Sequence, residues 1–341
     1  MNILITGGSG FLGQILTKTL LAEGFECTNA DLRKWEIESP KYKYVFADVR
    51  DMEKMDEIFS NGKFDAVFHL AAILSHDRAH KKDLWSTNVD GTSNITSLCE
   101  KYDVKKLTFI STNCLWGKSQ DEPVFETTIP QPVEPYGFSK LEAEKHVQKF
   151  SRHIIFRCPP IMDEGRVGLL SCLFEFIDAD KRIPIVGDGT NRYSFVYAKD
   201  VCASCVKAIS TDVTGIFNLA CKNPKTFNEI YEYVISKSGS KSTLIHISKK
   251  LLLPFMQTAS FLGISPIGKY QYSMIDGNCV FDISKATEIL GFCPTLSNEE
   301  ILLKTYLFYK ENKAKICCDT SLSPQQGVVN AGVIRLLRRF M

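Results

Sequence analysis

The stretch that decides the fold is Asn2-Ile-Leu-Ile-Thr-Gly-Gly-Ser-Gly-Phe-Leu-Gly13. Its residues 3–5 are apolar and partly β-branched, which predicts a short buried strand, and residues 14–23 after it predict a helix. Between them, glycines recur at three-residue spacing, at Gly7, Gly10 and Gly13. A glycine turn that leads into a helix lets the backbone N–H groups and the helix dipole bind a pyrophosphate. The glycines alone also fit an ordinary turn that needs positive φ, so further motifs are needed to distinguish a phosphate-binding turn from an ordinary one.

The bulk composition fits a globular protein with a sizeable core. The chain has 341 residues, 44% of them hydrophobic and 23% charged, with a formal net charge of +2. This length fits one large α/β domain or two linked ones. So small a net charge favours neither nucleic acid nor a membrane surface as a partner. No run of 18 apolar residues exists, and residue 1 leads directly into the first strand. We therefore expect a cytoplasmic protein without a membrane span.

Twelve cysteines are scattered along the chain, and we expect them to be reduced thiols in the cytosol. One Cys-x-x-Cys pair, Cys202 and Cys205, lies in a helical pattern of apolar residues, with no second pair and no nearby histidine. This context favours small buried core residues over a redox or zinc site. No metal site is predicted.

An acidic residue follows the second predicted strand. Residues 25–30 are expected to form this strand, which places Asp31 at its tip, 18 residues beyond Gly13. In a dinucleotide-binding fold this carboxylate accepts hydrogen bonds from the adenosine ribose and repels the 2′-phosphate of NADP. Arg33 is the alternative, since its cation suits a phosphate. The pattern favours NAD over NADP, and the other interpretation of Asp31 is a plain loop aspartate.

The remaining pattern predicts further elements of an α/β fold. Strands and helices are expected, in chain order, over residues 44–47, 52–59, 66–72 and 83–100. Asp51 is predicted to cap the first of these helices. Asn88 and Gly91 are locally unfavourable inside the long helix and predict a kink or a contact near the site. His69 lies within a buried strand and is interpreted as packed rather than catalytic.

A hydroxyl, a phenol and an amine follow in an order that suits proton transfer. A fifth strand is predicted over residues 107–110, and Ser111 and Thr112 follow at its end. A helix is predicted to begin at Tyr136 and to run to about residue 150. Tyr136 and Lys140 are four residues apart and therefore share one helix face. An ammonium beside the phenol favours the phenolate and lowers the tyrosine pKa. With Thr112 holding the same substrate oxygen, these groups form a proton shuttle for an alcohol–ketone interconversion.

Taken together, the order of these motifs resembles the extended short-chain dehydrogenase/reductase family, in its NAD-dependent epimerase/dehydratase group, over roughly residues 2–310. The resemblance implies a Rossmann-type doubly wound parallel sheet with a smaller C-terminal substrate-binding α/β domain. The NAD-binding domain is expected over 1–160 with parts of 190–220, and the substrate-binding domain over 161–190 and 221–312. Residues 313–341 are expected to be a tail, either a surface helix or a disordered end.

The resemblance also implies roles for individual residues. Thr112, Tyr136 and Lys140 fall on the catalytic positions, because Leu115-Trp116-Gly117 matches the segment that follows the family's catalytic hydroxyl. NAD is the implied cofactor. Its contacts are implied at Gly7, Gly10, Phe11, Leu12, Gly13, Asp31, Asp48, Val49, Leu70, Ala71, Ala72, Asn88, Tyr136, Lys140 and Pro159. The implied partner is a second copy of the chain, joined through two helices near residues 88–102 and 137–150.

Two departures from the family pattern narrow the chemistry. Sugar 4,6-dehydratases place Asp-Glu directly after the catalytic threonine, whereas Asn113-Cys114 stand there in this chain, which disfavours dehydration. A cysteine at this place resembles GDP-sugar 3,5-epimerases, and Cys114 is therefore a possible auxiliary residue. Those enzymes need an opposing His or Lys, and residues 161–175 contain neither. A small packed thiol is the favoured interpretation of Cys114.

The favoured substrate is a nucleotide sugar, acted on at a secondary alcohol or ketone by a 4-epimerase or a 4-ketoreductase. Thr112, Asn113 and Arg192 are the candidate substrate contacts, with Arg192 as a phosphate donor or a surface arginine. A hydroxysteroid-type or other alcohol dehydrogenase is the alternative, supported by Pro159-Pro160 and the apolar residues 249–263. A non-catalytic NAD-binding scaffold is the third hypothesis, and the intact Thr-Tyr-Lys set argues against it.

Overall fold

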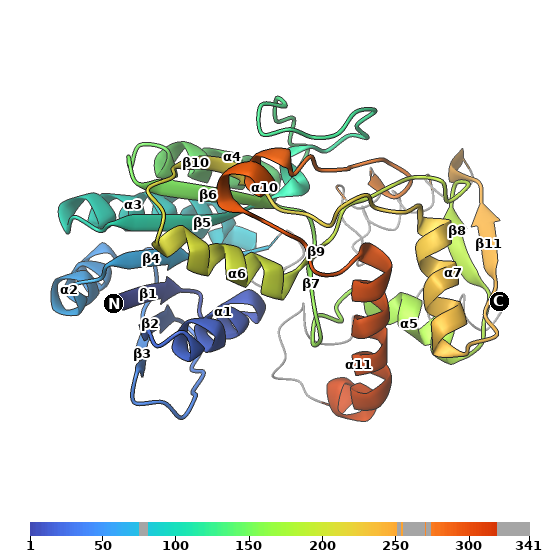
Figure 1. Cartoon of the computed structure of the whole chain (residues 1–341), viewed down its shortest axis with the longest axis horizontal. Coiled ribbons are helices and arrows are strands. Elements are labelled where there is room, and N and C mark those ends of the chain that lie inside the picture. Colours follow the sequence, from blue (N-terminus) through green and yellow to red (C-terminus); the bar gives the residue numbers. More distant parts are fainter. Residues whose placement is uncertain (75–80, 251–253, 255–269, 271–273, 319–341) are drawn as a thin grey trace.

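The computed structural model describes residues 1–74, 81–250, 254, 270 and 274–318. Of the apolar stretch 249–263, only residues 249, 250 and 254 fall within this part, and residues 319–341 of the predicted tail lie outside it. Figure 1 shows a layered α/β unit that contains the N-terminus beside a smaller lobe that contains α7 and α11.

Within the described residues, seven parallel strands form one sheet. They are β1 (Asn2–Thr6), β2 (Glu26–Asp31), β3 (Tyr42–Phe46), β4 (Ala66–His69), β5 (Lys106–Thr112), β6 (His153–Cys158) and β10 (Gly215–Asn218). Their order is β10-β6-β5-β4-β1-β2-β3, so the chain changes direction between β1 and β4. Ligands of such sheets bind at the carboxyl ends of the strands beside this point. The predicted Rossmann-type sheet is confirmed.

Helices cover both faces of the sheet because side chains alternate along each strand. In β1, Ile3 and Ile5 face the core shared with α1 and α6, whereas Leu4 faces the core shared with α2, α3 and α4. Cys202 and Cys205 of α6 lie in the first of these cores, which confirms them as small buried residues. The helices are α1 (Phe11–Ala22), α2 (Met52–Gly62), α3 (Gly91–Lys101), α4 (Pro135–Val147) and α6 (Ala198–Ile209).

Two predicted elements differ from the observed ones. β4 ends at His69, so the small residues 70–72 follow the strand rather than belong to it. The long helix predicted over 83–100 is divided into a 3-10 turn (Lys81–Asp83), a π-helical turn (Ser86–Asp90) and α3. The extra backbone width of the π-helical turn falls at the predicted kink. Asp51 caps α2 as predicted, since its side chain accepts the Lys54 N–H at 3.0 Å.

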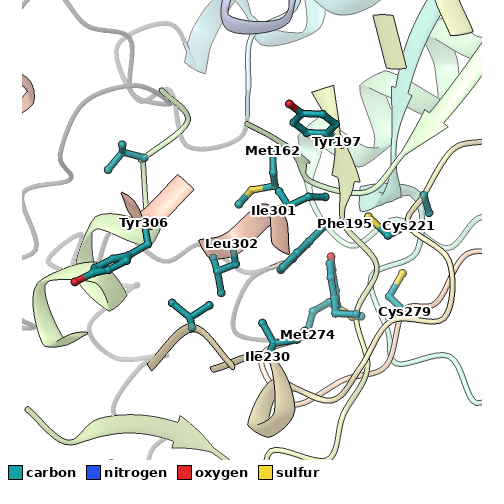
Figure 2. Packing of buried hydrophobic residues seen from close by; sticks show 14 of the residues in the cluster. Met162, Phe195, Tyr197, Cys221, Ile230, Met274, Cys279, Ile301, Leu302 and Tyr306 are labelled. Atoms are coloured by element: carbon teal, nitrogen blue, oxygen red, sulfur yellow. The ribbon is translucent and has the colours of Figure 1, made fainter. Parts of the chain in front are cut away.

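The smaller lobe has its own hydrophobic core. Side chains of α7 and α11 meet those of the segment that leads into β9, as Ile230, Leu302 and Phe195 do in Figure 2. Two short parallel pairs accompany them, one between β8 and β11 and one between β7 and β9. These elements are α5 (Leu170–Asp178), α7 (Phe227–Ser238), α11 (Asn298–Cys318), β7 (Ile161–Met162), β8 (Ile183–Val186), β9 (Val196–Tyr197) and β11 (Leu244–Ile247). The predicted C-terminal α/β unit is present.

The domain boundaries stay a prediction, and two elements of the structure cross them. The boundary after residue 312 falls inside α11, which continues to Cys318. Helix α10 (Ser284–Leu290) was assigned to the substrate-binding domain, yet Ala286 and Leu290 pack into the core beside α1 and α6. The apolar face of α10 therefore joins the N-terminal domain. Among the described residues, no helix is long and apolar enough to cross a membrane.

Candidate active site

The glycine turn after β1 is held in a conformation that side chains would prevent. Gly7 has φ +74°, and a Cβ there would lie 2.6 Å from the Ala71 nitrogen, just beyond β4. A Cβ on Gly13 would lie 2.4 Å from the Gly7 carbonyl oxygen. The N-cap of α1, Gly10, provides no side-chain acceptor for the first-turn N–H groups. These N–H groups and the helix dipole fit the pyrophosphate of a dinucleotide.

Asp31 lies at the carboxyl end of β2, next to the glycine turn. Its carboxylate accepts the Ser9 N–H at 3.0 Å and the Arg33 N–H at 2.9 Å. The acid is thereby held beside the turn, where the ribose of a dinucleotide lies in this fold. At the same edge of the sheet, the Asp48 carboxylate forms an ion pair with Arg50 at 2.7 Å. The Val49 side chain packs against Gly91, where a Cβ would collide with it.

Asn88 connects the end of β4 to the helix that carries Tyr136. Its side-chain amide accepts the Ile73 N–H at 2.8 Å and donates to the Ile73 carbonyl at 3.0 Å. It also donates to the Ser139 hydroxyl at 3.0 Å, and Ser139 donates to the Tyr136 carbonyl at 2.8 Å. The segment containing Leu70, Ala71 and Ala72 is thus placed relative to α4. Ser139 was missed by the sequence reasoning, because serine inside a helix carries no specific signal.

His69 is a packed residue, as predicted. Its two ring nitrogens lie 2.6 Å from the Thr6 hydroxyl and 2.9 Å from the Thr92 hydroxyl. Burial lowers the pKa of His69 to about 3, so the ring is neutral at neutral pH. The histidine therefore bridges β1, β4 and α3 beneath the cofactor side of the sheet.

The three predicted catalytic residues lie at the carboxyl end of β5. Thr112 is the last residue of that strand, while Tyr136 and Lys140 occupy the first turns of α4. The helix approaches very closely, because a Cβ on Gly137 would lie 2.4 Å from the Cys114 carbonyl oxygen. Glycine at position 137 is what allows Tyr136 to reach Thr112.

The electrostatics of the pair differ from the prediction. Burial raises the pKa of Tyr136, and its hydrogen bond with Thr112 only partly opposes this. The Lys140 Nζ lies 3.7 Å from the centre of the Phe109 ring, so its charge faces β5. Burial lowers the pKa of Lys140 to about 7, with Glu144 acting in the opposite direction. The expected lowering of the tyrosine pKa by lysine is therefore wrong for this arrangement, and the phenol is protonated at neutral pH.

Glu144 extends the row formed by Tyr136 and Lys140 by one more helical turn. Its carboxylate forms a fully buried ion pair with Arg157 of β6 at 2.7 Å. The Arg157 guanidinium also lies 5.3 Å from the Trp116 ring centre and donates to the Glu126 carbonyl. Glu144 is thus a fixed counter-charge for Lys140. The four-residue spacing from 136 to 140 to 144 was the signal that the sequence reasoning missed.

Asn113 and Cys114 occupy the place next to Thr112. The Thr112 oxygen accepts the Cys114 N–H at 3.1 Å and lies 3.5 Å from the Asn113 side-chain oxygen, to which it donates. The Asn113 amide nitrogen donates to the hydroxyls of Tyr193 and, at 2.8 Å, Tyr270. Burial raises the pKa of the Cys114 thiol, which is therefore neutral.

Two further charged residues near Tyr136 were not predicted. Arg166 lies 5.4 Å from the Phe11 ring centre, and its charge acts on Tyr136. Burial lowers the pKa of Arg166 to about 10. Glu134 is 6% exposed, and its negative charge raises the pKa of both Tyr136 and Cys114. Neither lies in a motif, so only the tertiary structure brings them to the site.

Arg192 does not join this group. It is exposed, and its guanidinium donates to the Pro224 carbonyl at 3.0 Å, whereas the next residue, Tyr193, points inward to Asn113. The assignment of Arg192 to the substrate stays a prediction. Pro159 is buried directly after β6.

The model of the NAD dependent epimerase/dehydratase family matches residues 3–220, which contain the glycine turn, Thr112, Tyr136 and Lys140. The chain belongs to this family. It is an enzyme of the extended short-chain dehydrogenase/reductase type, with NAD as its cofactor. Gly7, Gly10, Gly13 and Asp31 are the residues that fit NAD at the carboxyl edge of the sheet.

Several relatives cover most of the chain. An uncharacterized protein of Sinorhizobium fredii is 31% identical over 319 residues, covering 92% of this chain and 80% of its own. The UDP-glucuronate 4-epimerase of Thermodesulfobacterium geofontis is 28% identical over 336 residues, covering 91% of this chain and 96% of its own. The crystal structure of UDP-glucose 4-epimerase with UDP-glucose from Thermotoga maritima matches with a TM-score of 0.74 and 25% identity. That match covers 92% of this chain and 100% of the other.

Proposed function

We propose that the protein is an NAD-dependent 4-epimerase of a nucleotide sugar. The observation that carries this proposal is the grouping of Thr112, Tyr136 and Lys140 at the end of β5 beside an amide and a thiol. The first three groups suit proton exchange at a secondary alcohol. The residues directly after Thr112 carry no carboxylate for eliminating water.

Each side chain has a distinct part in the proposed reaction. The Thr112 hydroxyl donates to the Asn113 side-chain oxygen only at 3.5 Å, a long contact that leaves its proton available to a substrate oxygen. Tyr136, whose pKa is raised by burial, holds the proton that is exchanged at that oxygen. Lys140 is positioned by the Phe109 ring and by the Glu144 counter-charge. NAD, when bound, exchanges hydride at the carbon that bears the same oxygen.

The named relatives support a nucleotide sugar as the substrate, since two of them are 4-epimerases of UDP-sugars. If the ketone leaves after a single hydride transfer, the same residues make a 4-ketoreductase instead. A nucleotide sugar is favoured over the hydroxysteroid alternative, because the UDP-glucuronate 4-epimerase and the UDP-glucose 4-epimerase each cover most of this chain.

The test is turnover of UDP-sugars by the purified protein without added cofactor. We expect interconversion of UDP-glucose with UDP-galactose, or of the corresponding uronates, with no net change in NADH. Tyr136→Phe is expected to lower kcat by at least about 100-fold while NAD stays bound. Tyr102→Phe, at the surface end of α3, is the matched control and is expected to keep full activity. Net NADH consumption with a 4-keto sugar would overturn the epimerase in favour of the ketoreductase.

We further propose that the protein is a homodimer joined through α3 and α4. The two helices pack side by side, and a surface hollow between them is lined by Thr96, His146 and Phe150, among others. Near their starts, Trp85 and Phe138 are each 49% exposed and provide apolar surface that a second copy would cover. Sedimentation of the wild type as a dimer and of Phe138→Asp as a monomer is expected, with Phe125→Asp as the control on another exposed aromatic. A cytoplasmic location is also proposed, since Cys27, Cys99 and Cys205 are buried thiols that form no disulfide.

A further inference from the structure

A cluster of neutral polar groups lies directly beside Thr112. It consists of Asn113 after β5, Tyr193 before β9 and Tyr270 in the smaller lobe, which are 4%, 8% and 6% exposed. The Asn113 amide donates to both phenol oxygens, and the two phenol oxygens lie 2.7 Å apart. Burying a polar group costs free energy unless the group is hydrogen-bonded, so each donor and acceptor of the cluster needs a partner.

Among the residues that the structure describes, one of the two phenol protons has no acceptor at normal hydrogen-bond distance. Both Asn113 amide protons are used on the phenol oxygens, and one phenol donates to the other. For the second phenol proton, the acceptor within the described residues is the Asn113 backbone carbonyl, 3.5 Å from the Tyr270 oxygen. An O–H···O hydrogen bond is normally 2.5–3.0 Å long, so this contact is too long to satisfy the proton.

The Tyr193 segment of the cluster is also held in place by hydrogen bonds to two neighbouring segments. Asn298 at the start of α11 donates to the Tyr193 carbonyl at 2.7 Å and accepts the Phe195 N–H at 3.0 Å. On the other side, Cys279 pairs its backbone with the segment of Tyr193, since Ser194 donates to the Cys279 carbonyl at 2.9 Å. A donor held this rigidly loses little entropy when it binds an oxygen.

The charge around the cluster selects the kind of oxygen. The groups that act on Tyr193 and Tyr270 are Cys114, Cys279, Asn113 and the two phenols themselves. Within the described part of the chain, no lysine, arginine or histidine is among them. Burial raises the pKa of both phenols, so they are neutral donors. A carboxylate placed there would be desolvated without a counter-charge, whereas a hydroxyl oxygen would be accepted.

We propose that Asn113, Tyr193 and Tyr270 form a subsite that binds a neutral hydroxyl of the sugar, near the carbon that Thr112 and Tyr136 act upon. The reason is that Asn113 follows Thr112 in the chain and its side-chain oxygen lies within 3.5 Å of the Thr112 hydroxyl. The spare phenol proton donates to the substrate hydroxyl and completes the network. This assignment rests on the proposed function and specifies its substrate.

The experiment compares nucleotide sugars that differ by this one oxygen. With UDP-glucose as the parent, the 3-deoxy and 6-deoxy analogues remove the hydroxyls on C3 and C6, which are the two hydroxyls nearest to C4 besides its own. We expect kcat/KM of the wild type to fall by about 10- to 100-fold for one of the two analogues and not for the other. The analogue that loses activity identifies which of the two hydroxyls is bound. Equal kcat/KM for the parent and both analogues would overturn the subsite.

A double variant tests the residues themselves. In Tyr193→Phe/Tyr270→Phe the preference for the parent over the sensitive analogue is expected to shrink to about 1, because no phenol proton remains. Tyr306→Phe, a buried tyrosine of α11 in the same lobe, is the control and is expected to keep the wild-type preference. A preference that survives the double variant would assign the selectivity to other residues and contradict the proposal.

The outcomes separate this inference from the proposed function. If the wild type turns over none of the UDP-sugars, the proposed function is wrong. If it turns over UDP-glucose and both deoxy analogues alike, the proposed function stands and the subsite alone is wrong. Should the double variant fail to fold, as judged by its NAD content and thermal unfolding, the comparison of analogues on the wild type still decides.

Discussion

The cofactor side and the substrate side of this site are built in different ways. On the cofactor side, the glycine turn and Asp31 come from one β-α-β stretch, and the bond from Ser9 to Asp31 spans only 22 residues. On the substrate side, Asn113 bonds to Tyr193 and Tyr270, which are 80 and 157 residues away. The first is local geometry that a short stretch enforces, whereas the second exists only after the smaller lobe has packed against the sheet.

The two sides also differ in charge. The cofactor side combines a helix N-terminus without a side-chain cap with one carboxylate, which suits a charged dinucleotide. The substrate side next to Thr112 consists of an amide, a thiol and two phenols, whose ionisable members are kept neutral by burial. The partial charge of the helix N-terminus and the Asp31 carboxylate therefore suit a charged cofactor. The neutral hydrogen-bonding groups beside Thr112 suit the hydroxyls of a sugar.

The largest effect is expected from a methyl group on the cofactor side. In Gly13→Ala the new Cβ would meet the Gly7 carbonyl at 2.4 Å, which is backbone that cannot move aside. Strain and the loss of charge-assisted contacts to the pyrophosphate together cost about 4 kcal/mol, or about 1000-fold in NAD affinity. Titration calorimetry with NAD measures this. Gly239→Ala is the control, because it adds a methyl at φ +72° in open space and is expected to cost about 1–2 kcal/mol of stability with NAD binding intact.

A glycine-to-alanine substitution on the substrate side is expected to affect turnover rather than NAD binding. In Gly137→Ala the Cβ would meet the Cys114 carbonyl at 2.4 Å and push the start of α4 away from Thr112. A shift of about 1 Å in Tyr136 lowers kcat by about 100-fold, while the NAD dissociation constant stays within a few-fold. Steady-state kinetics and NAD titration on the same preparation separate the two. Lys145→Ala, an exposed position of α4, should leave both unchanged, and weakened NAD binding by Gly137→Ala would break the distinction between the sides.

A smaller effect is expected from the pH dependence of His69, beneath the cofactor side. Its pKa is about 3 in the fold and 6.5 as the usual value, so only the unfolded chain takes up a proton between these values. Stability is therefore lost as the pH falls through this window, by about 1.4 kcal/mol per pH unit from this residue. Urea unfolding between pH 4 and 7 measures the slope. His69→Asn should reduce the slope of the unfolding free energy against pH by that amount, whereas the exposed His246→Asn should leave the slope unchanged. Equal slopes in the wild type and both variants would show that His69 does not cause the pH dependence.

Much of the fold was predictable because it follows local patterns. The apolar period of β1, the capping aspartate of α2 and the four-residue spacing of Tyr136 and Lys140 each act within a few residues. The errors arose where a neighbour in space overrides local preference. The predicted long helix contains a π-helical turn at Asn88, whose side chain accepts the Ile73 N–H beyond β4.

By itself, the sequence determined the Rossmann-type sheet, the glycine turn with Asp31, and the presence of a threonine, a tyrosine and a lysine in catalytic order. These depend on backbone conformation and periodicity, which short stretches encode. Only the tertiary structure decided that Lys140 faces Phe109 and Glu144, and that Tyr193 rather than Arg192 points inward beside Thr112. The physical reason is that pKa values and hydrogen-bond partners depend on burial and on groups distant in the chain, and packing alone sets both.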